Sequence, residues 1–443
     1  MNMTVDTGAR TSVQIGFGLP QTGRFEATAL ARPGEDLAVV VRRGEQSSTY
    51  KVRCLPMGFP RWKFERTGST SPGLFAVATA NSDSQPWIIV FDGDGVPRWW
   101  HSPRTDVLGA QVLSDGTVAW PRAFGDGYGQ DPRMAHEVRS LSGDLVRLVR
   151  TEGSITDGHE FRELPSGNIL INSYRPEDGI DLSSFILPGQ QGPRDGSAVF
   201  AEIQEVDPSG KVVWRWNSRG HIGLEETPVR WRDSIIANPH PGPFGPTYDP
   251  VHLNSVDAWG ADRLIISTRH TDAVYGIDKE TGDIVFKLGG TPTPESLAVV
   301  GDPAGPATPG EGTFGGQHDA RIDAEGNLTV FDNGTDRARD PRVVTYQLDI
   351  EEGTATYAGE LTDPRIDESH CCGSARQTPA GEWLVSWGDE SLITEFDIAG
   401  EVAFRLTLPT PSFRAVPVPV GSVTPGALDD GLEAMERRDG LPR

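Results

Sequence analysis

A repeated pair of short strands constrains this chain more than any other feature. The recurring unit is an apolar strand, a Gly-bearing turn with Asp, and a second strand, and it occurs six times. The copies are Ile88–Trp100, Val138–Val149, Ile203–Trp216, Val274–Leu288, Val343–Leu361 and Ile393–Leu406. Hairpins in tandem predict a repetitive all-β architecture rather than a chain of unrelated domains.

A second hairpin lies between these copies, with a polar Gly-bearing turn followed by an alternating strand. Its copies are Ala110–Trp120, Glu160–Ser173, Ser255–Thr268, Ala320–Asn333 and Ala375–Trp387, and a less regular one begins near Leu74. One hairpin of each kind makes a four-stranded antiparallel sheet. The sequence therefore predicts a six-bladed β-propeller of four-stranded antiparallel blades with a small N-terminal β unit.

Three regions follow from this pattern. Residues 11–55 alternate apolar and polar side chains, which predicts a β-rich segment or small sandwich over residues 1–70, with the alternative that these strands belong to the first blade. Residues 71–408 form the propeller, with the active site at the channel mouth. Residues 409–443 form a Pro-rich C-terminal tail, in which Gly426–Arg437 is a candidate helix. Three Gly/Pro-rich inserts are expected in the propeller, and two of them run into a histidine: Arg175–Ser197, Arg219–Pro250 and Gly289–Gly316.

Composition limits the classes of molecule that the protein can bind. The net charge of −23 argues against binding nucleic acid or an anionic membrane surface, and no apolar run is long enough to span a bilayer. The first twenty residues lack the apolar core of a signal peptide, so we expect a soluble cytoplasmic protein, or an extracytoplasmic one if a leader has been removed. Composition sets no expectation for the oligomeric state.

The three cysteines do not form a metal-binding pattern. Cys54, Cys371 and Cys372 include no CxxC pair, which argues against a disulfide scaffold or a zinc knuckle. Adjacent cysteines bridge each other rarely, because neighbouring Cα atoms are only 3.8 Å apart. A bridge from Cys54 to one of the pair stays open.

Three histidines share one position in the repeat. Each lies eight residues before the turn glycine of its own hairpin, and the three are His159, His252 and His318. The same position holds Leu108 in an early blade and Gly373 in the last, so packing does not require histidine there. Equivalent positions of different blades converge at one end of the central channel. We therefore expect the three imidazoles to face one another at the channel mouth.

Two other polar residues belong to this candidate site. Asn254 lies two residues after His252 and so on the same face of a strand, and Arg269 lies in the next strand. A guanidinium suits a tetrahedral oxyanion, although a surface salt bridge is an alternative. Three imidazoles and a water would also suit a catalytic zinc ion, but a nearby arginine would repel it.

These residues carry a family resemblance. Val251–Gly290, which holds HLNSV and STRH, and Gln317–Gly334, which holds QHDA and FDNG, resemble the aryl-sulfate sulfotransferases. Members of that family are six-bladed propellers that need no nucleotide sulfate donor. The similarity runs in order from about Leu74 to Leu408.

The resemblance implies a ping-pong transfer from an aryl sulfate to a phenol through a sulfohistidine. It implies that His318 is the nucleophile, that His252 and Asn254 bind sulfate, and that Arg269 clamps the transferring group. His159 matches a third active-site histidine. Small-molecule aryl sulfate and phenol are then the partners, and no cofactor or metal is expected.

Two other functions remain open. One is a metal-dependent hydrolase or lyase on the same three histidines, and the other is a non-catalytic propeller that binds a ligand. The segment His370–Ser374, with the sequence HCCGS, departs from the family pattern, so donor and acceptor identities are not implied.

Overall fold

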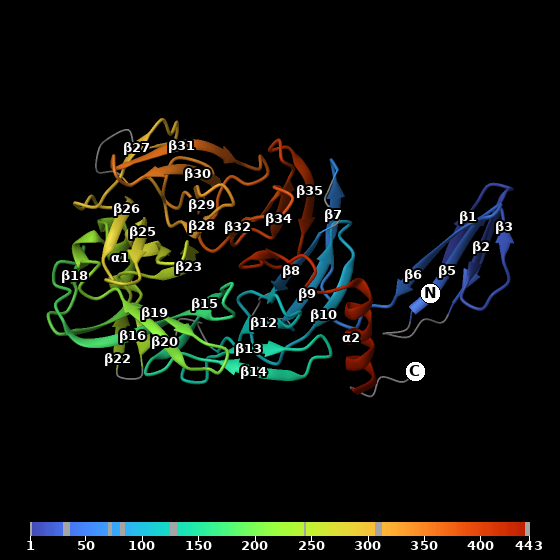
Figure 1. The fold of residues 1–443 in the computed structure, drawn as a ribbon, viewed down its shortest axis with the longest axis horizontal. Helices are drawn as coiled ribbons and strands as arrows, with labels where there is room; N and C mark the ends of the chain where they lie inside the picture. Colours follow the sequence, from blue (N-terminus) through green and yellow to red (C-terminus); the bar gives the residue numbers. More distant parts are fainter. Residues whose placement is uncertain are drawn as a thin grey trace. The chain divides into compact units, whose positions relative to one another are not determined.

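The computed structural model describes residues 2–29, 36–69, 73–79, 85–124, 131–242, 245–305 and 312–438. Over these residues the chain is all-β, with 36 strands and two α-helices (Figure 1). It forms two compact units. Unit one comprises Met1–Pro60, Leu141–Gly143 and Pro425–Arg443, and unit two comprises Arg61–Ser140 and Asp144–Thr424. The region boundaries expected at residues 70 and 408 stay a prediction.

Unit one holds the strands expected in the N-terminal segment. One sheet pairs β1 (Asn2–Asp6) with β4 (Arg24–Thr28), and the other has the order β3 (Gln21–Thr22), β2 (Thr11–Ile15), β5 (Asp36–Arg43), β6 (Gln46–Arg53). Val13 pairs with Val41, and Val39 pairs with Tyr50, in the alternating register. The expected C-terminal helix is confirmed as α2 (Pro425–Arg438).

Unit two contains six sheets of at least four strands, and the four strands named below for each sheet pair antiparallel, whereas further strands join sheets three and five in parallel. Sheet one is β36 (Ala415–Pro417), β8 (Leu74–Thr79), β9 (Trp87–Asp92) and β10 (Pro97–His101); sheet two is β11 (Gln111–Val112), β12 (Val118–Pro121), β13 (His136–Arg139) and β14 (Leu145–Val149). Sheet three is β15 (Ile155–Glu163), β16 (Ile169–Ile180), β19 (Gly196–Val206) and β20 (Val212–Asn217); sheet four is β23 (Leu253–Trp259), β24 (Arg263–Thr268), β25 (Ala273–Asp278) and β26 (Ile284–Gly289). Sheet five is β28 (His318–Ile322), β29 (Leu328–Asp332), β30 (Arg342–Asp349) and β31 (Thr354–Leu361); sheet six is β32 (Ser374–Gln377), β33 (Trp383–Ser386), β34 (Leu392–Phe396) and β35 (Val402–Thr407).

Both repeated hairpins are therefore confirmed from sheet two to sheet six. Sheet one differs, because its first strand, β36, comes from the C-terminal segment and pairs with β8. Residues 80–84 of the irregular copy near Leu74 lie outside the described part of the chain. At the other end, β7 (Lys63–Arg66) precedes sheet one in sequence but pairs with β35 of sheet six. Strands from both ends of unit two are thus hydrogen-bonded into sheets at the opposite end of the sequence.

The core of unit two lies between neighbouring sheets. The strand β24 shows why: Leu264 and Ile266 pack against residues of sheet three, whereas Ile265 packs with residues of sheet five. Successive side chains of a strand point to opposite faces, so a strand with apolar residues throughout is buried on both sides. The first strands of successive sheets contact one another, as β15 contacts β23 and β23 contacts β28.

The inserts add short elements around sheets three to five. Arg175–Ser197 contains the hairpin of β17 (Ile186–Leu187) and β18 (Gln190–Gln191), and Gly289–Gly316 contains β27 (Ala298–Val300), with 306–311 outside the described residues. Arg219–Pro250 contributes the short 3-10 helix η1, α1, β21 and β22, which span Leu224–Glu226, Val229–Ala237, His240–Gly242 and Gly245–Tyr248. No helix in the described part of the chain is both long and apolar enough to cross a bilayer.

Candidate functional site

The three histidines of the repeat come together on or directly before the first strands of sheets three, four and five. His159 lies on β15, His252 directly precedes β23, and His318 is the first residue of β28. All three side chains are buried. The rings of His159 and His252 lie 5.2 Å apart between centroids. We call these three residues the histidine cluster.

The ring of Phe413 contacts both His159 and His318 of the cluster. Its ring lies edge-on to His159 at 5.6 Å and to His318 at 6.1 Å between centroids. It precedes β36, the first strand of sheet one, and its side chain is buried. An apolar ring between two imidazoles excludes water from them and strengthens the electrostatic interactions there.

The backbone is irregular where these strands begin. His252, Asp319 and Cys372 have positive φ angles of 55°, 51° and 68°. The ladder between β28 and β29 shifts register between His318 and Arg321. Non-glycine residues in the left-handed region are uncommon and concentrate at functional sites. These irregular entries re-aim side chains that a regular strand would point elsewhere.

His318 is held by neutral acceptors. Its Nδ1 lies 2.9 Å from the Gly316 carbonyl oxygen and 2.8 Å from Asn333 Oδ1. The Asn333 amide is oriented because its Nδ2 donates to Ser369 Oγ and to the Cys372 carbonyl. The imidazole proton therefore sits on Nδ1, and Nε2 carries the lone pair. That lone pair accepts a hydrogen bond from the Cys372 N–H at 3.2 Å.

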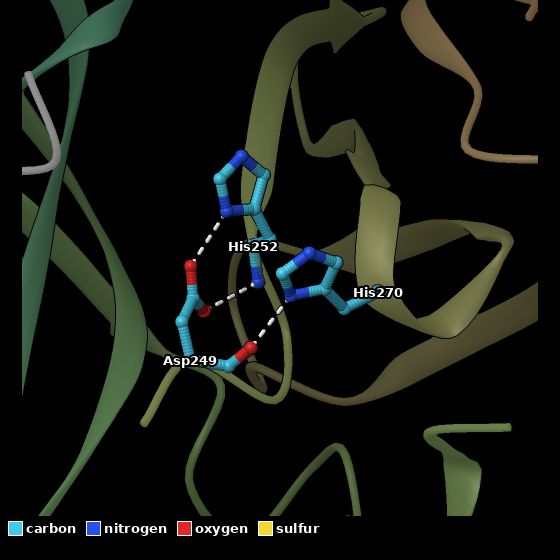
Figure 2. Close-up of side chains that lie close together, drawn as sticks. All are labelled: Asp249, His252 and His270. Carbon is cyan, nitrogen blue, oxygen red and sulfur yellow. Dashed lines mark hydrogen bonds and ion pairs between the residues drawn. The ribbon is translucent and has the colours of Figure 1, made fainter. Parts of the chain in front are cut away.

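The other two histidines are held by carboxylates. His252 Nδ1 lies 2.6 Å from Asp249 Oδ2, and the His252 N–H donates to the other oxygen of Asp249 (Figure 2). His159 has the same arrangement with Asp157, whose Oδ1 lies 2.6 Å from Nδ1. A carboxylate on Nδ1 stabilises the imidazolium form, which a neutral amide does less well. The three imidazoles thus differ in the group that holds Nδ1, which is a carboxylate for His159 and His252 and a neutral amide and a carbonyl for His318.

Burial and neighbouring charges keep two of these imidazoles neutral. Burial, followed by the positive charge of Arg269, holds the pKa of His318 well below its usual value. Burial, followed by the charges of His159 and Arg269, does the same to the pKa of His252. Both imidazoles are therefore unprotonated at neutral pH.

Arg269 lies beside the cluster in the short 3-10 helix η2 (Arg269–Thr271), directly after β24 rather than within a strand as expected. Its guanidinium lies over the Trp231 ring at 4.3 Å and donates through Nη2 to the His370 carbonyl at 2.8 Å. Its Nε is buried and has no hydrogen-bond acceptor among the described residues. This orphan donor can bind an oxygen of an anionic ligand.

Asn254 is buried on β23 next to the cluster. Its Nδ2 donates to the Gln317 carbonyl at 2.8 Å, while Oδ1 has no partner among the described residues. As oriented, Asn254 offers an acceptor to the site, which suits a hydroxyl group better than a sulfate oxygen. Sulfate binding by Asn254 stays a prediction.

The side chains that lie close enough to share a metal ion are not the three histidines considered for a zinc ion from the sequence. Among the described residues they are Asp249, His252 and His270. Both Nδ1 atoms of the two imidazoles already face oxygens of Asp249, as Figure 2 shows. The Nε2 of His270 lies 3.2 Å from a guanidinium nitrogen of Arg269. This positive charge opposes a cation, so the set suits hydrogen bonding better than metal binding.

A buried ion network lies further along the same strands. It joins two carboxylates to three guanidiniums: Glu160, Asp319, Arg321, Arg376 and Arg414. Burial alone would raise the pKa of Glu160, but the charges of the arginines outweigh it and hold that pKa well below its usual value. Asp319, the neighbour of His318, serves this network rather than the imidazole. We call these five residues the ion network.

Four residues of the site were not predicted: Asp249, Asn333, Cys372 and Phe413. Asp249 precedes His252 by three residues, much as Asp157 precedes His159 by two, and this spacing was a usable signal. Asn333 was visible only as part of the FDNG motif. Phe413 and Cys372 reach the site through pairing between distant segments, for which the sequence contains no local pattern.

Comparison with known proteins identifies relatives. A family model described as arylsulfotransferase (ASST) matches residues 133–408. The chain is 26% identical over 337 residues to an arylsulfate sulfotransferase AssT of Escherichia coli O6:H1, which covers 64% of this chain and 54% of that protein. An AssT of Lelliottia amnigena is 25% identical over 336 residues, covering 61% and 52%. The chain thus spans about half the length of these curated relatives.

Among solved structures, a protein of unknown function from Bacteroides caccae is similar with a TM-score of 0.47 and 11% identity. The match covers 79% of this chain and 100% of that chain.

Proposed function

Because the chain belongs to the arylsulfotransferase (ASST) family, we propose that it transfers a sulfuryl group from an aryl sulfate to a phenolic acceptor. The observation that carries the proposal is the orientation of His318. Two neutral acceptors hold the proton on Nδ1, and burial beside Arg269 keeps the ring unprotonated. Nε2 is therefore a nucleophile at neutral pH without a separate base.

We also propose that the six sheets of unit two are the blades of a β-propeller. Contacts between successive first strands, and the pairing of β7 and β36 across the ends of the sequence, support this arrangement. Figure 1 shows sheets two to six following one another in the order of the colour bar. In a propeller closed in this way, the first strands of all blades lie around one axis.

The first proposed step forms a sulfohistidine. His318 Nε2 attacks the sulfur of the aryl sulfate, the S–O bond to the ring breaks, and the phenolate leaves. Charge gathers on the peripheral sulfuryl oxygens, where the Arg269 guanidinium stabilises it. The orphan Nε donor of Arg269 supports this role, since it is buried beside the cluster with unused hydrogen-bonding capacity.

The second step transfers the group to the acceptor phenol. The acceptor must lose its proton as its oxygen attacks the sulfur, and the S–N bond to His318 Nε2 breaks, which restores the neutral imidazole. His159 and His252 suit the removal of this proton, because a carboxylate stabilises each imidazolium once it forms. The imidazolium then releases this proton to solvent, and the phenolate that left in the first step takes up one from solvent. No nucleotide donor is needed in this ping-pong scheme, and each half-reaction uses the His318 imidazole.

The test uses a chromogenic aryl sulfate such as 4-nitrophenyl sulfate, with and without phenol. We expect 4-nitrophenol release to depend on phenol and phenyl sulfate to appear in equal amount. After quenching without acceptor, mass spectrometry should find a sulfuryl adduct on the peptide that contains His318. The variant His318→Asn should form no adduct, and Glu65→Gln, which changes an exposed ion pair, is the matched control.

Three results would replace the proposal. Release that proceeds equally well with water as the acceptor indicates a hydrolase. Stoichiometric bound metal, with activity lost on chelation, indicates a metal-dependent enzyme. Absence of both adduct and turnover with a range of aryl sulfates favours a binding protein.

A further inference from the structure

The segment Ser369–Gly373 forms one wall of the site and carries two adjacent thiols. Three groups of the site are anchored on its backbone: His318 Nε2 accepts from the Cys372 N–H, Asn333 donates to the Cys372 carbonyl, and Arg269 donates to the His370 carbonyl. A change in the conformation of this backbone therefore alters hydrogen bonds of His318, Asn333 and Arg269 at the same time.

The two thiols contact each other. Cys371 and Cys372 form no disulfide, and both are partly exposed. A hydrogen bond from the Cys372 thiol lowers the pKa of the Cys371 thiol, and the same bond, with burial, raises the pKa of Cys372. A thiol with a lowered pKa is the one that reacts with peroxide, and the neighbouring thiol can resolve the product.

We propose that Cys371 and Cys372 are a reversible redox site that switches the enzyme off when oxidised to a disulfide; the effect on transfer rests on the proposed function. The Cys371 thiolate attacks hydrogen peroxide, the O–O bond breaks, and a sulfenic acid and water form. The Cys372 sulfur then loses its proton and displaces the hydroxyl group as a second water. Two thiols are oxidised, and one peroxide is reduced to two waters.

Geometry explains why this bridge would act as a switch. A relaxed disulfide joins Cα atoms about 4.4–6.8 Å apart, whereas adjacent Cα atoms are about 3.8 Å apart. Closing the ring must therefore twist the peptide between Cys371 and Cys372. That peptide is held on both sides, since its N–H donates to His318 Nε2 and its carbonyl accepts from the Asp389 N–H at 3.1 Å. A strained, accessible bridge is also readily reduced, which makes the change reversible.

The experiment measures formation of the disulfide separately from its effect on His318 reactivity and on sulfuryl transfer. The intact protein is treated with hydrogen peroxide, then with or without a dithiol reductant. Mass spectrometry should show the peptide holding Cys371 and Cys372 lighter by two hydrogens and resistant to alkylation, with recovery after reduction. Carbethoxylation of His318 by diethyl pyrocarbonate should change at least threefold between the two states. Transfer should fall at least fivefold and recover with reductant.

Variants separate the switch from general damage. Cys54→Ser should respond to peroxide as the unmodified chain does, and Cys371→Ser should show neither the bridge nor the reversible loss. Failure to form the bridge overturns the proposal, as does a bridge that changes neither His318 reactivity nor transfer. If no state transfers sulfuryl groups, the proposed function fails, while the peptide mass and His318 reactivity still decide whether the switch exists.

Discussion

His318 and Asp319 are neighbours on β28, yet one belongs to the histidine cluster and the other to the ion network. Asp319 accepts from Arg321 at 2.8 Å and from Arg376 at 2.7 Å, so its charge is matched within the fold. His318 has one nitrogen held by neutral groups and the other contacted only by a backbone N–H at 3.2 Å. Of these two adjacent residues, Asp319 uses its polar atoms in ion pairs within the fold, whereas His318 uses its own in hydrogen bonds to neutral groups.

The difference separates groups that hold the structure from groups available for chemistry. In the ion network, removing one charge leaves its buried partners with an unmatched charge, so each member is needed for stability. In the histidine cluster, a hydrogen-bond partner fixes the Nδ1 atom of each ring and thereby the orientation of its Nε2 atom. Variants of the two regions should therefore fail in different assays.

The largest effect is expected for His318, the proposed nucleophile. His318→Asn should lower kcat/KM for sulfuryl transfer by about 10⁴-fold or more, equivalent to at least about 5 kcal/mol of barrier. It should change the free energy of unfolding by only about 1 kcal/mol, because it removes one hydrogen-bonded group. Steady-state kinetics and urea unfolding of the same sample test both statements. A large loss of stability with retained transfer would break the comparison.

Removal of a charge from the ion network should do the reverse. Glu160→Gln leaves Asp319 as the one carboxylate of the network beside Arg321 and Arg414 and should cost about 3–5 kcal/mol of the free energy of unfolding. The same substitution at the more exposed Glu65, which pairs with Arg365, should cost less. Urea unfolding of the two variants is the measurement, and equal losses would contradict a structural role for the network.

Exchanging the partner of an imidazole should shift the pH profile. Asn333→Asp places a carboxylate beside Nδ1 of His318, which raises its pKa and protonates the nucleophile. We expect the acid limb of kcat/KM to move to higher pH and the rate at pH 7 to fall about 10²-fold. The matched exchange Asp249→Asn should lower the rate without moving that limb. An unmoved limb in Asn333→Asp would refute the assignment of His318.

Mild acid should act on three buried histidines, two of them in the histidine cluster, before it acts on the ion network. The pKa values of His252, His270 and His318 are held below the unfolded value of about 6.5, chiefly by burial. Below pH 6.5 the unfolded chain binds protons that the folded chain does not, so stability is complete above this pH and falls as the pH decreases.

Between pH 7 and pH 6, proton uptake by these three histidines in the unfolded chain should lower the free energy of unfolding by about 2 kcal/mol in total. The carboxylates of the ion network, whose pKa values are lowered, should contribute only below their unfolded pKa values near pH 4. Urea unfolding across this range tests the order, and the slope between pH 7 and pH 6 should decrease in His318→Asn. Stability that is constant down to pH 5 would contradict the lowered values.

Much of the fold could be predicted from local patterns. The turn glycines and the alternating strands around them located both kinds of hairpin, because turn chemistry and side-chain alternation act over a few residues. The first strand of sheet one could not be found in this way. Ala415–Pro417 is three residues long, ends in proline, and becomes a strand only because β8 supplies its hydrogen bonds.

By itself, the sequence determined the hairpin repeat and the common position of His159, His252 and His318 within it, since both depend on spacing along one strand. Only the tertiary structure decided which nitrogen of each imidazole is held and by what. Asn333, Cys372 and Phe413 come from other strands or other sheets, and their contacts with the cluster depend on how the sheets pack. Hydrogen-bond partners across a fold have no fixed sequence separation, so no local pattern records them.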